Sequence, residues 1–339
     1  MRFNIILMGD KSKSDLPPLE ERFLPPKGWL WGNFHNANGM NIRFGKVGPE
    51  QGKAKKAIVV GLQGLSEFSE KYFETARELQ EKGIEFYMMD WAGQGGSDRF
   101  LSNTHKRHSS GFDQDVADLH KFMEEQVKPN AFDEDGNPIP IVMLAHSMGG
   151  NIGMRYLTQY KDDFTCAAFS APMLDIYVLK SWPLAIKKTL VSLFQKAMAQ
   201  HYAFGGSDWD PYERVHLSEK IFSSDPVRNA VHNTWFEHDP DLQVGGPTFT
   251  WVLEALKSCL KLKDVKALKA IKTPVLFARA KHEFLVSDKA IAYAAKHMPD
   301  AKMIDIDDCR HEILMENDDA RNQFLNAFFD HMKKHGIKL

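Results

Sequence analysis

The sequence has little cysteine and no long uncharged apolar run. Its 339 residues include only three cysteines, Cys166, Cys259 and Cys309. Their odd number and unrelated spacings argue against a disulfide framework and against a cysteine metal cluster. No window is long and apolar enough to predict a membrane span. At the start only Ile5 to Met8 are consecutively apolar, so we expect no signal peptide. These features predict reduced thiols and a cytoplasmic location.

The sequence also lacks an excess of either charge. It has 43 lysines and arginines against 45 aspartates and glutamates, a formal net charge of −2, and no block of like charges. We therefore expect no nucleic acid partner. The hydrophobic content of 43% and the length are sufficient for one large α/β domain or two smaller ones. The oligomeric state is left open.

The most informative stretch runs from Ile141 to Gly150. An apolar run ends in Ala-His-Ser-Met-Gly-Gly, and a helical pattern follows. This order predicts a strand, a sharp turn with Ser147 on it, and a helix. The turn differs by one residue, Ala145, from Gly-x-Ser-x-Gly, in which the serine is a nucleophile on a strained backbone. The alternative is that Ser147 is an ordinary helix N-cap.

Strand and helix patterns alternate along most of the chain. Residues 29–47 predict antiparallel edge strands. Further strands are predicted at residues 57–62, 84–89, 141–146, 166–169, 274–278 and 302–306. Helices are predicted at residues 69–82, 151–160, 287–297 and about 317–335, and another opens at a capping box, Ser110 to Asp113. The alternation predicts an α/β protein with a doubly wound, mostly parallel sheet.

Residues 172–261 break this alternation. They contain many large aromatic residues, Trp182 among them, and helical patterns without a clear buried strand. We interpret them as an inserted, mainly helical cap between two parts of one core, residues 1–171 and 262–339. An aromatic cap predicts an apolar slot for an acyl chain.

Within this cap, residues 183–198 form an amphipathic pattern. Its apolar stripe consists of Ile186, Leu190, Val191, Phe194 and Met198. Lys187, Lys188 and Lys196 lie off the stripe. Such a helix suits a peripheral contact with a lipid surface at the inner face of the membrane, and packing within the cap is the alternative.

A serine nucleophile near neutral pH needs a base and an orienting carboxylate. In parallel α/β sheets the chemistry gathers at the carboxyl ends of the strands. His311 follows the last predicted strand and Glu283 follows the strand before it, in the order serine, acid, histidine. Taken alone, His311 would be interpreted as a loop histidine and Glu283 as a surface carboxylate. His282, Asp307 and Asp308 are close enough in sequence to compete with Glu283.

An oxyanion formed at Ser147 needs two hydrogen-bond donors. One is the backbone N–H of Met148, at the start of a helix whose dipole favours negative charge. The other is expected from the loop after an earlier strand. We choose the backbone N–H of Leu65, because Gly64 before it lets the chain turn inward. The alternative is that residues 63–66 are a plain connecting loop.

Five motifs, in order from about residue 40 to residue 335, resemble those of the α/β-hydrolases that include monoglyceride lipases and bacterial lysophospholipases. They are Gly64 to Glu67 with Lys71-Tyr72, Asp90 to Ser97, Ala145 to Gly150, Gly245 to Thr248 with Trp251, and Arg310 to Leu314. Gln63 and Phe68 replace two histidines of that group, and Ala92 replaces an arginine.

This resemblance implies the α/β-hydrolase fold and a serine carboxylester hydrolase acting through an acyl-enzyme. The implied substrate is a small acyl ester, such as a lysophospholipid or a monoacylglycerol, and no cofactor or metal is implied. Two rival interpretations remain. One is a peptidase or perhydrolase on the same fold, and the other is a small-molecule receptor with slow turnover.

Overall fold

The computed structural model describes residues 16–177, 183–212 and 220–339. Residues 1–15, which include the apolar start, and Trp182 of the predicted cap lie outside these described residues. Eight strands form one sheet in the order β1-β2-β4-β3-β5-β6-β7-β8. They are β1 (Leu30–His35), β2 (Asn41–Val47), β3 (Ala57–Leu62), β4 (Ile84–Met89), β5 (Ile141–His146), β6 (Cys166–Ser170), β7 (Val275–Ala280) and β8 (Ala301–Ile306).

Strand direction follows the sequence patterns. The pairs β1–β2 and β2–β4 are antiparallel, and every other neighbouring pair is parallel. Strands β3, β4, β5 and β6 are mostly apolar and are buried at every position. Such sequences suit strands covered on both faces. The sheet confirms the predicted α/β class with a doubly wound, mostly parallel sheet.

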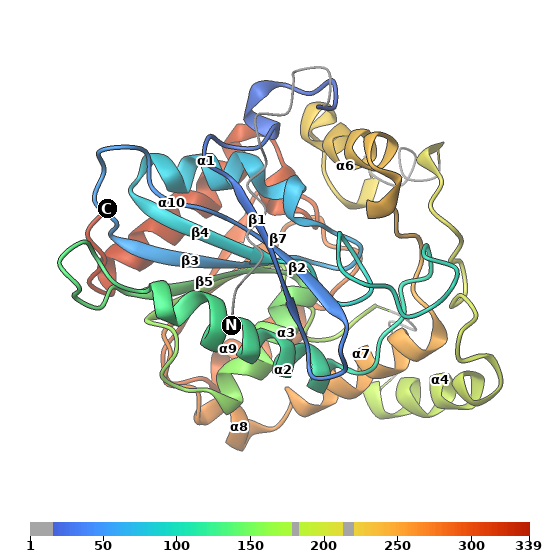
Figure 1. Ribbon diagram of the computed structural model, residues 1–339. Helices are drawn as coiled ribbons and strands as arrows, with labels where there is room; N and C mark the ends of the chain where they lie inside the picture. Colours follow the sequence, from blue (N-terminus) through green and yellow to red (C-terminus); the bar gives the residue numbers. More distant parts are fainter. Residues whose placement is uncertain (1–15, 178–182, 213–219) are drawn as a thin grey trace.

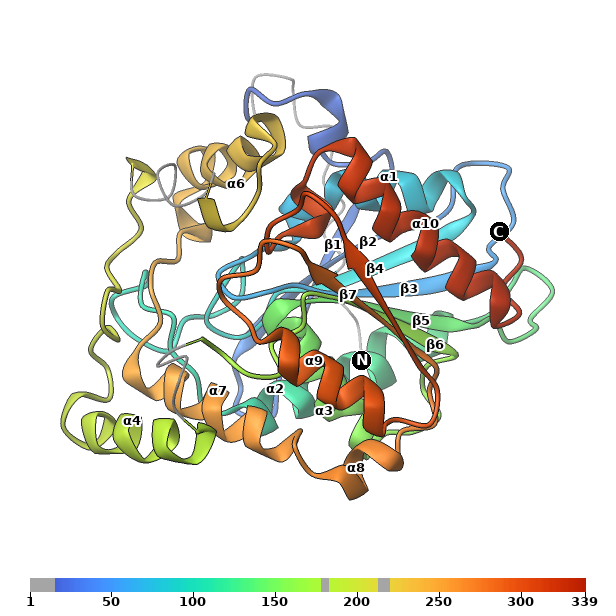
Figure 2. The same ribbon diagram turned by 180° about the vertical axis from the view of Figure 1, so that it is seen from behind.

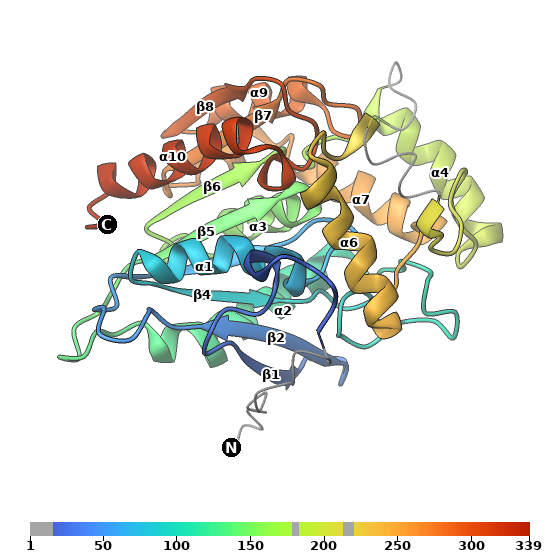
Figure 3. The same cartoon turned by 90° about the horizontal axis from the view of Figure 1, so that it is seen from above.

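Helices cover both faces of the sheet. Helices α1 (Phe73–Glu81) and α10 (Asp318–Lys334) lie on one face, and α2 (Phe112–Phe122), α3 (Ser147–Gln159) and α9 (Asp288–His297) lie on the other (Figures 1 and 3). A short helix α8 (Val265–Lys269) precedes β7. Single turns complete the framework: η2 (Glu21–Phe23), η3 (Ser69–Tyr72), η4 (Met123–Val127), η5 (Lys128–Asn130), η6 (Pro240–Leu242) and η7 (Ile313–Met315).

The region between β6 and β7 contributes helices α4 (Leu184–Met198), α6 (Pro226–His238) and α7 (Phe249–Lys261). Figures 2 and 3 show these helices beyond the end of the sheet to which the parallel strands point. The division of the chain at residues 172 and 261 stays a prediction. Among the described residues, none of the helices combines the length and the hydrophobicity that crossing a bilayer requires.

The predicted capping box at Ser110 is wrong. Helix α2 begins at Phe112 after Gly111, which has a φ of 115°, and no side chain caps the helix. The N–H of Gly111 donates to the hydroxyl of Ser109 instead. The local spacing could not show that the chain enters this helix through a left-handed glycine.

All three cysteines are free and buried, in agreement with the prediction of reduced thiols. Burial raises the pKa of Cys166 and that of Cys309 to about 12. Both therefore stay protonated near neutral pH, where the neutral thiol is a weak nucleophile.

Candidate functional site

Ser147 lies at a sharp turn between β5 and α3. Its φ is 49°, a left-handed value that is rare for a residue with a side chain. Two residues later only glycine fits, at Gly149, because a Cβ there would lie 2.2 Å from the carbonyl oxygen of Leu62. Ala145 is accommodated in β5, where it pairs with Leu62 and with Phe169. The backbone thus has the geometry expected of the elbow predicted from the sequence.

The structure brings His311 next to Ser147. The Nε2 atom of His311 is 2.8 Å from the Oγ atom of Ser147. His311 follows β8 on a loop whose N–H groups, at His311 and Glu312, donate to the carbonyls of Ile221 and Phe222. Only 7% of Ser147 and 3% of His311 are exposed, so bulk water has little access to either group.

Glu283, which follows β7, contacts the other side of the imidazole. Its Oε2 atom is 2.8 Å from Nδ1 of His311. Its Oε1 atom accepts hydrogen bonds from the N–H groups of Leu285 at 2.7 Å and Val286 at 3.1 Å. Both oxygens of the carboxylate are therefore held in place.

The competing residues lie elsewhere. The side chain of His282 is half exposed and is 3.9 Å from Asp308. The side chains of Asp307 and Asp308 are 72% and 97% exposed. Among the alternatives left open by the sequence, the geometry therefore selects Glu283 as the partner of His311.

The two ionisable groups shift each other's pKa. Burial disfavours the charged form of His311, but the charge and hydrogen bond of Glu283 outweigh it, and Glu312 and Glu67 add to the effect, so the pKa of His311 is raised. Burial also disfavours ionised Glu283, but the charge and hydrogen bond of His311 and the two N–H donors keep the pKa of Glu283 lowered. A charged carboxylate beside a histidine is the arrangement that supports proton abstraction from a hydroxyl.

The loop that carries Leu65 lies against this site. A Cβ added to Gly64 would lie 3.2 Å from the Cβ of Ser147 and 3.1 Å from His146, so only glycine fits there without displacing a neighbour. Among the described residues, the backbone N–H groups of Leu65 and Met148 have no protein acceptor. Both N–H groups are therefore available to an oxyanion at Ser147.

A buried lysine connects the loop of Leu65 to the loop of His311. Lys71 is 1% exposed, and its ammonium is 2.7 Å from Glu67 and 2.7 Å from Glu312. The carboxylate of Glu67 also accepts from the N–H of Gly64 at 2.5 Å and from the hydroxyl of Tyr72 at 2.7 Å. The sequence pattern alone did not show this ion pair network, because Glu312 is far from Lys71 along the chain.

A second group of side chains was also missed. Gln94 and Arg107 are completely buried and bond to each other, and Gln94 also bonds to the loop at residues 64–67. Gln94 belongs to the Asp90 to Ser97 motif. That motif indicated a turn, but it could not show which residues the amide would contact.

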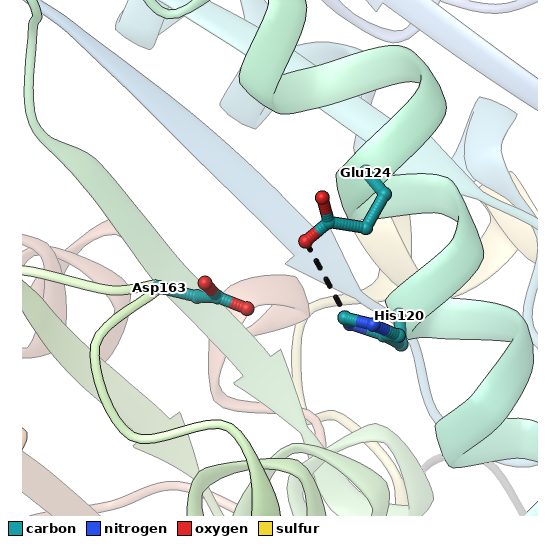
Figure 4. A group of neighbouring side chains, drawn as sticks. All are labelled: His120, Glu124 and Asp163. Atoms are coloured by element: carbon teal, nitrogen blue, oxygen red, sulfur yellow. Dashed lines mark ion pairs between the residues drawn. The ribbon is translucent and has the colours of Figure 1, made fainter.

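His120, Glu124 and Asp163 offer ligand atoms close enough to surround a metal ion (Figure 4). The ammonium of Lys128 already pairs with Glu124 and is 2.5 Å from Asp163. A cation would have to displace it. This cluster lies outside the Ser147 site and is explained by its own ion pairs.

The structure also contains a cavity of about 500 Å³. Residues of α2, α3, α4 and α7 line it, and most of them are charged. Ser147, His311 and Glu283 are not among its lining residues.

Comparison with known proteins identifies the family. A family model described as "Serine aminopeptidase, S33" matches residues 53–318. The chain is 27% identical over 285 residues to lysophospholipase L2 of Escherichia coli K12, an alignment that covers 82% of this chain and 81% of that one. It is 27% identical over 281 residues to the probable lysophospholipase L2 of Haemophilus influenzae, covering 83% and 84% of the two chains.

The fold also matches solved structures. A soluble variant of monoglyceride lipase from Saccharomyces cerevisiae, in complex with a substrate analog, superposes with a TM-score of 0.69 at 18% identity and covers 94% of this chain and all of that one. These findings confirm the predicted α/β-hydrolase fold and the predicted resemblance. The chain belongs to the serine aminopeptidase S33 family of α/β-hydrolases, and it is a serine hydrolase similar to lysophospholipases and monoglyceride lipases.

Proposed function

We propose that this protein hydrolyses carboxylic esters through an acyl-enzyme at Ser147. The observation that carries the proposal is the continuous hydrogen-bond chain from Ser147 through His311 to Glu283, with both heavy-atom distances at 2.8 Å. A serine, a base and an orienting carboxylate in this geometry form the minimal apparatus for acyl transfer.

The proposed reaction has two halves. His311 takes the proton of the Ser147 hydroxyl as its oxygen attacks the ester carbonyl, and the N–H groups of Leu65 and Met148 stabilise the oxyanion. The alcohol leaves with the proton returned by His311. Water, deprotonated by His311, then attacks the acyl-enzyme and releases the acid. Glu283 keeps the imidazole oriented and stabilises its charged form.

We infer that the ester is a single-acyl lipid, such as a lysophospholipid or a monoacylglycerol. Lysophospholipase L2 and monoglyceride lipase are among the similar proteins, which supports this substrate class. We propose that residues 172–261 act as the cap over the site. Helix α6 of this region packs against the loop that carries Leu65: the ring of Phe68 is 4.9 Å from that of Phe236 and 5.2 Å from that of His232.

Ser147→Ala tests the proposed function. We expect turnover of a p-nitrophenyl ester to fall by several orders of magnitude, because the nucleophile is lost, while the fold is kept. Near-normal turnover by this variant would exclude the mechanism. The activity of the wild-type protein should also be measured on a panel of substrates. The panel consists of lysophosphatidylcholine, monoacylglycerols, short-chain esters, aminoacyl peptides and peroxide. It separates an esterase from a peptidase and from a perhydrolase. A burst of acylation without steady turnover would identify a receptor.

We also propose a cytoplasmic location with peripheral contact between α4 and a lipid surface. On α4, Ile186 is 48% and Leu193 is 62% exposed. Nearby, Phe204 is 79% exposed and its ring is 5.2 Å from that of Phe194 on α4. Exposed apolar residues gathered over one helix favour insertion into the interfacial region of a membrane.

A further inference from the structure

Gln94 uses its whole hydrogen-bonding capacity around the loop that carries Leu65. Its Nε2 atom donates to the carbonyl oxygens of Gly64 at 2.8 Å and Glu67 at 2.7 Å. Its Oε1 atom accepts from the N–H of Ser66 at 3.2 Å and from Nε of Arg107 at 2.9 Å. The side chain is 0% exposed, so protein groups rather than bulk water satisfy it.

Arg107 determines which way the Gln94 amide faces. A guanidinium has only donors, so the atom of Gln94 that faces Arg107 must be the oxygen. The NH2 group must then face the two carbonyls. Burial lowers the pKa of Arg107 to about 10, which leaves the guanidinium protonated at neutral pH. The amide orientation is therefore fixed by chemistry on both sides.

The segment at residues 245–248 holds Arg107 in place. The N–H of Arg107 donates to the carbonyl of Gly246 at 3.1 Å, and the N–H of Thr248 donates to the carbonyl of Arg107 at 2.9 Å. The hydroxyl of Ser66 donates to the carbonyl of Gly245 at 3.2 Å. This gives a structural role to the Gly245 to Thr248 motif, which the hydrolytic mechanism does not use directly.

The contact with Gly64 orients the next peptide bond. In a trans peptide the C=O of one residue and the N–H of the next point in opposite directions. Because Gln94 holds the C=O of Gly64, the N–H of Leu65 must point away from Gln94. Gly64 itself lies against Ser147. Rotation of this peptide would replace the donor by a carbonyl oxygen, which would repel an oxyanion.

We propose that Gln94 is a positioning residue for the oxyanion hole, acting by fixing the peptide between Gly64 and Leu65. The inference rests on the proposed ester hydrolysis at Ser147. Gln94 does not contact the reacting atoms. It acts through Leu65. Arg107 supports Gln94 through the bond from its Nε, and its Nη2 lies 4.0 Å from the Sδ atom of Met148.

Gln94→Met and Gln94→Glu test the proposal. Both remove the NH2 donor with little change in side-chain size. We expect kcat for a p-nitrophenyl ester to fall about 10²- to 10³-fold, the loss typical of one oxyanion donor, with KM changed less than about threefold. The affinity for an alkyl trifluoromethyl ketone, whose serine adduct carries an oxyanion, should fall by a similar factor.

Gln80→Glu is the matched control. The amide of Gln80 also donates to two backbone carbonyls, those of Lys27 at 3.0 Å and Gly48 at 2.9 Å, and it lies on α1 away from Ser147. This variant should lose stability without a change in kcat or ketone affinity. If the effect of the Gln94 variants came from a general loss of packing, Gln80→Glu would lower kcat and ketone affinity in the same way.

The outcomes separate this proposal from the proposed function. If Ser147→Ala abolishes turnover but a folded Gln94 variant keeps kcat within about threefold of the wild type, the positioning role is wrong and the function stands. A kcat loss without a matching loss of ketone affinity also overturns it. If neither Gln94 variant folds, Arg107→Met decides: parallel losses of kcat and ketone affinity support the proposal, and unchanged values overturn it.

Discussion

The carboxylate of Glu283 shows how much of the site depends on single residues. One oxygen accepts from the imidazole of His311 and the other from two backbone N–H groups. The neighbouring residue, His282, turns its side chain toward solvent and Asp308. Substitution of these two adjacent residues should therefore affect activity to very different extents.

Glu283→Gln should reduce kcat/KM by about 10²- to 10⁴-fold, because a neutral amide neither stabilises the imidazolium nor favours the correct tautomer. His282→Ala should leave kcat/KM within about threefold of the wild type, since it removes only an exposed side chain. Steady-state kinetics with one ester on both variants checks the ranking. The reverse ranking would show that Glu283 was assigned the wrong role.

The pH profile should reflect the raised pKa of His311. His311 accepts a proton only when it is neutral, so kcat/KM should fall as the pH drops through this pKa, and the midpoint should lie above 6.5. Glu283, Glu312 and Glu67 raise this pKa, while burial opposes it. His146, whose ring centre is 4.8 Å from that of His311, has its pKa lowered by burial.

In Glu312→Gln the same midpoint should move down, because one negative charge near His311 is removed. A wild-type midpoint below 6.5 would contradict the raised pKa of His311.

At the residue scale, the sequence was sufficient to predict that Ser147, Glu283 and His311 would lie together, because each follows a strand and strand ends converge in a parallel sheet. It was not sufficient to find Gln94. The role of that side chain depends on contacts with Gly64 and Arg107, and nothing in a single sequence shows which distant residues an amide will meet.

Among the elements, α4 differs most from its sequence pattern. Val191 is buried, and Phe194 and Met198 pack toward the core, whereas Ile186 and Leu193 face outward. The predicted single apolar stripe is therefore divided between two faces. The pattern could not show this, because the helix is apolar over a wider arc than one contact requires.

Lys187, which was predicted to lie off the stripe, points inward. It is 3% exposed and donates to the carbonyl of Ile176 at 2.9 Å, with Asp175 at 3.6 Å. Because the side chain of Lys187 lies on the inner face of α4, Ile186 and Leu193 lie on its outer face. The exposed face is consequently more apolar than the sequence suggested.

Leu193→Gln should weaken binding to vesicles of phosphatidylcholine and phosphatidylglycerol by about fivefold, because about 1 kcal/mol of apolar transfer is lost. Sedimentation of the protein with the vesicles measures this. Met303→Gln is the control, since Met303 is 37% exposed and belongs to strand β8, not to α4. Equal binding of the Leu193 variant and the wild type would exclude α4 as the contact.

For the whole molecule, one buried arginine joins the helical region between β6 and β7 to the sheet-covering helices. Arg228 on α6 donates to both oxygens of Glu74 on α1, each at 2.8 Å. It also bonds to Asp318 at 2.6 Å and to the carbonyl of Glu316 at 2.8 Å, at the start of α10. Segments more than 150 residues apart in sequence thus share one charged centre.

Arg228→Met should lower the free energy of unfolding by about 3 kcal/mol, because it leaves a buried carboxylate with fewer partners. The loss stays near the low end of the usual range, since Arg22 and Arg321 remain close to Glu74. Urea unfolding followed by circular dichroism measures it. Arg279→Met, which breaks an exposed pair with Asp305, should cost less than about 1 kcal/mol. Equal losses of unfolding free energy in the two variants would show that Arg228 contributes no more than a surface ion pair.

The doubly wound, mostly parallel sheet was predictable because strand and helix patterns alternate along the chain, but the anchoring of α6 was not. Arg228 lies in a polar helical pattern that would suit an exposed helix, and only the folded chain shows that Glu74 and Asp318 meet there. The spacing of residues along the chain does not predict long-range ion pairs of this kind.

The burial of all three thiols has a practical consequence. A maleimide dye should leave the native protein unlabelled, so a cysteine introduced in place of Leu193 would be the sole point of attachment. An environment-sensitive fluorophore there would report directly when helix α4 passes from water into lipid, with no background from native positions.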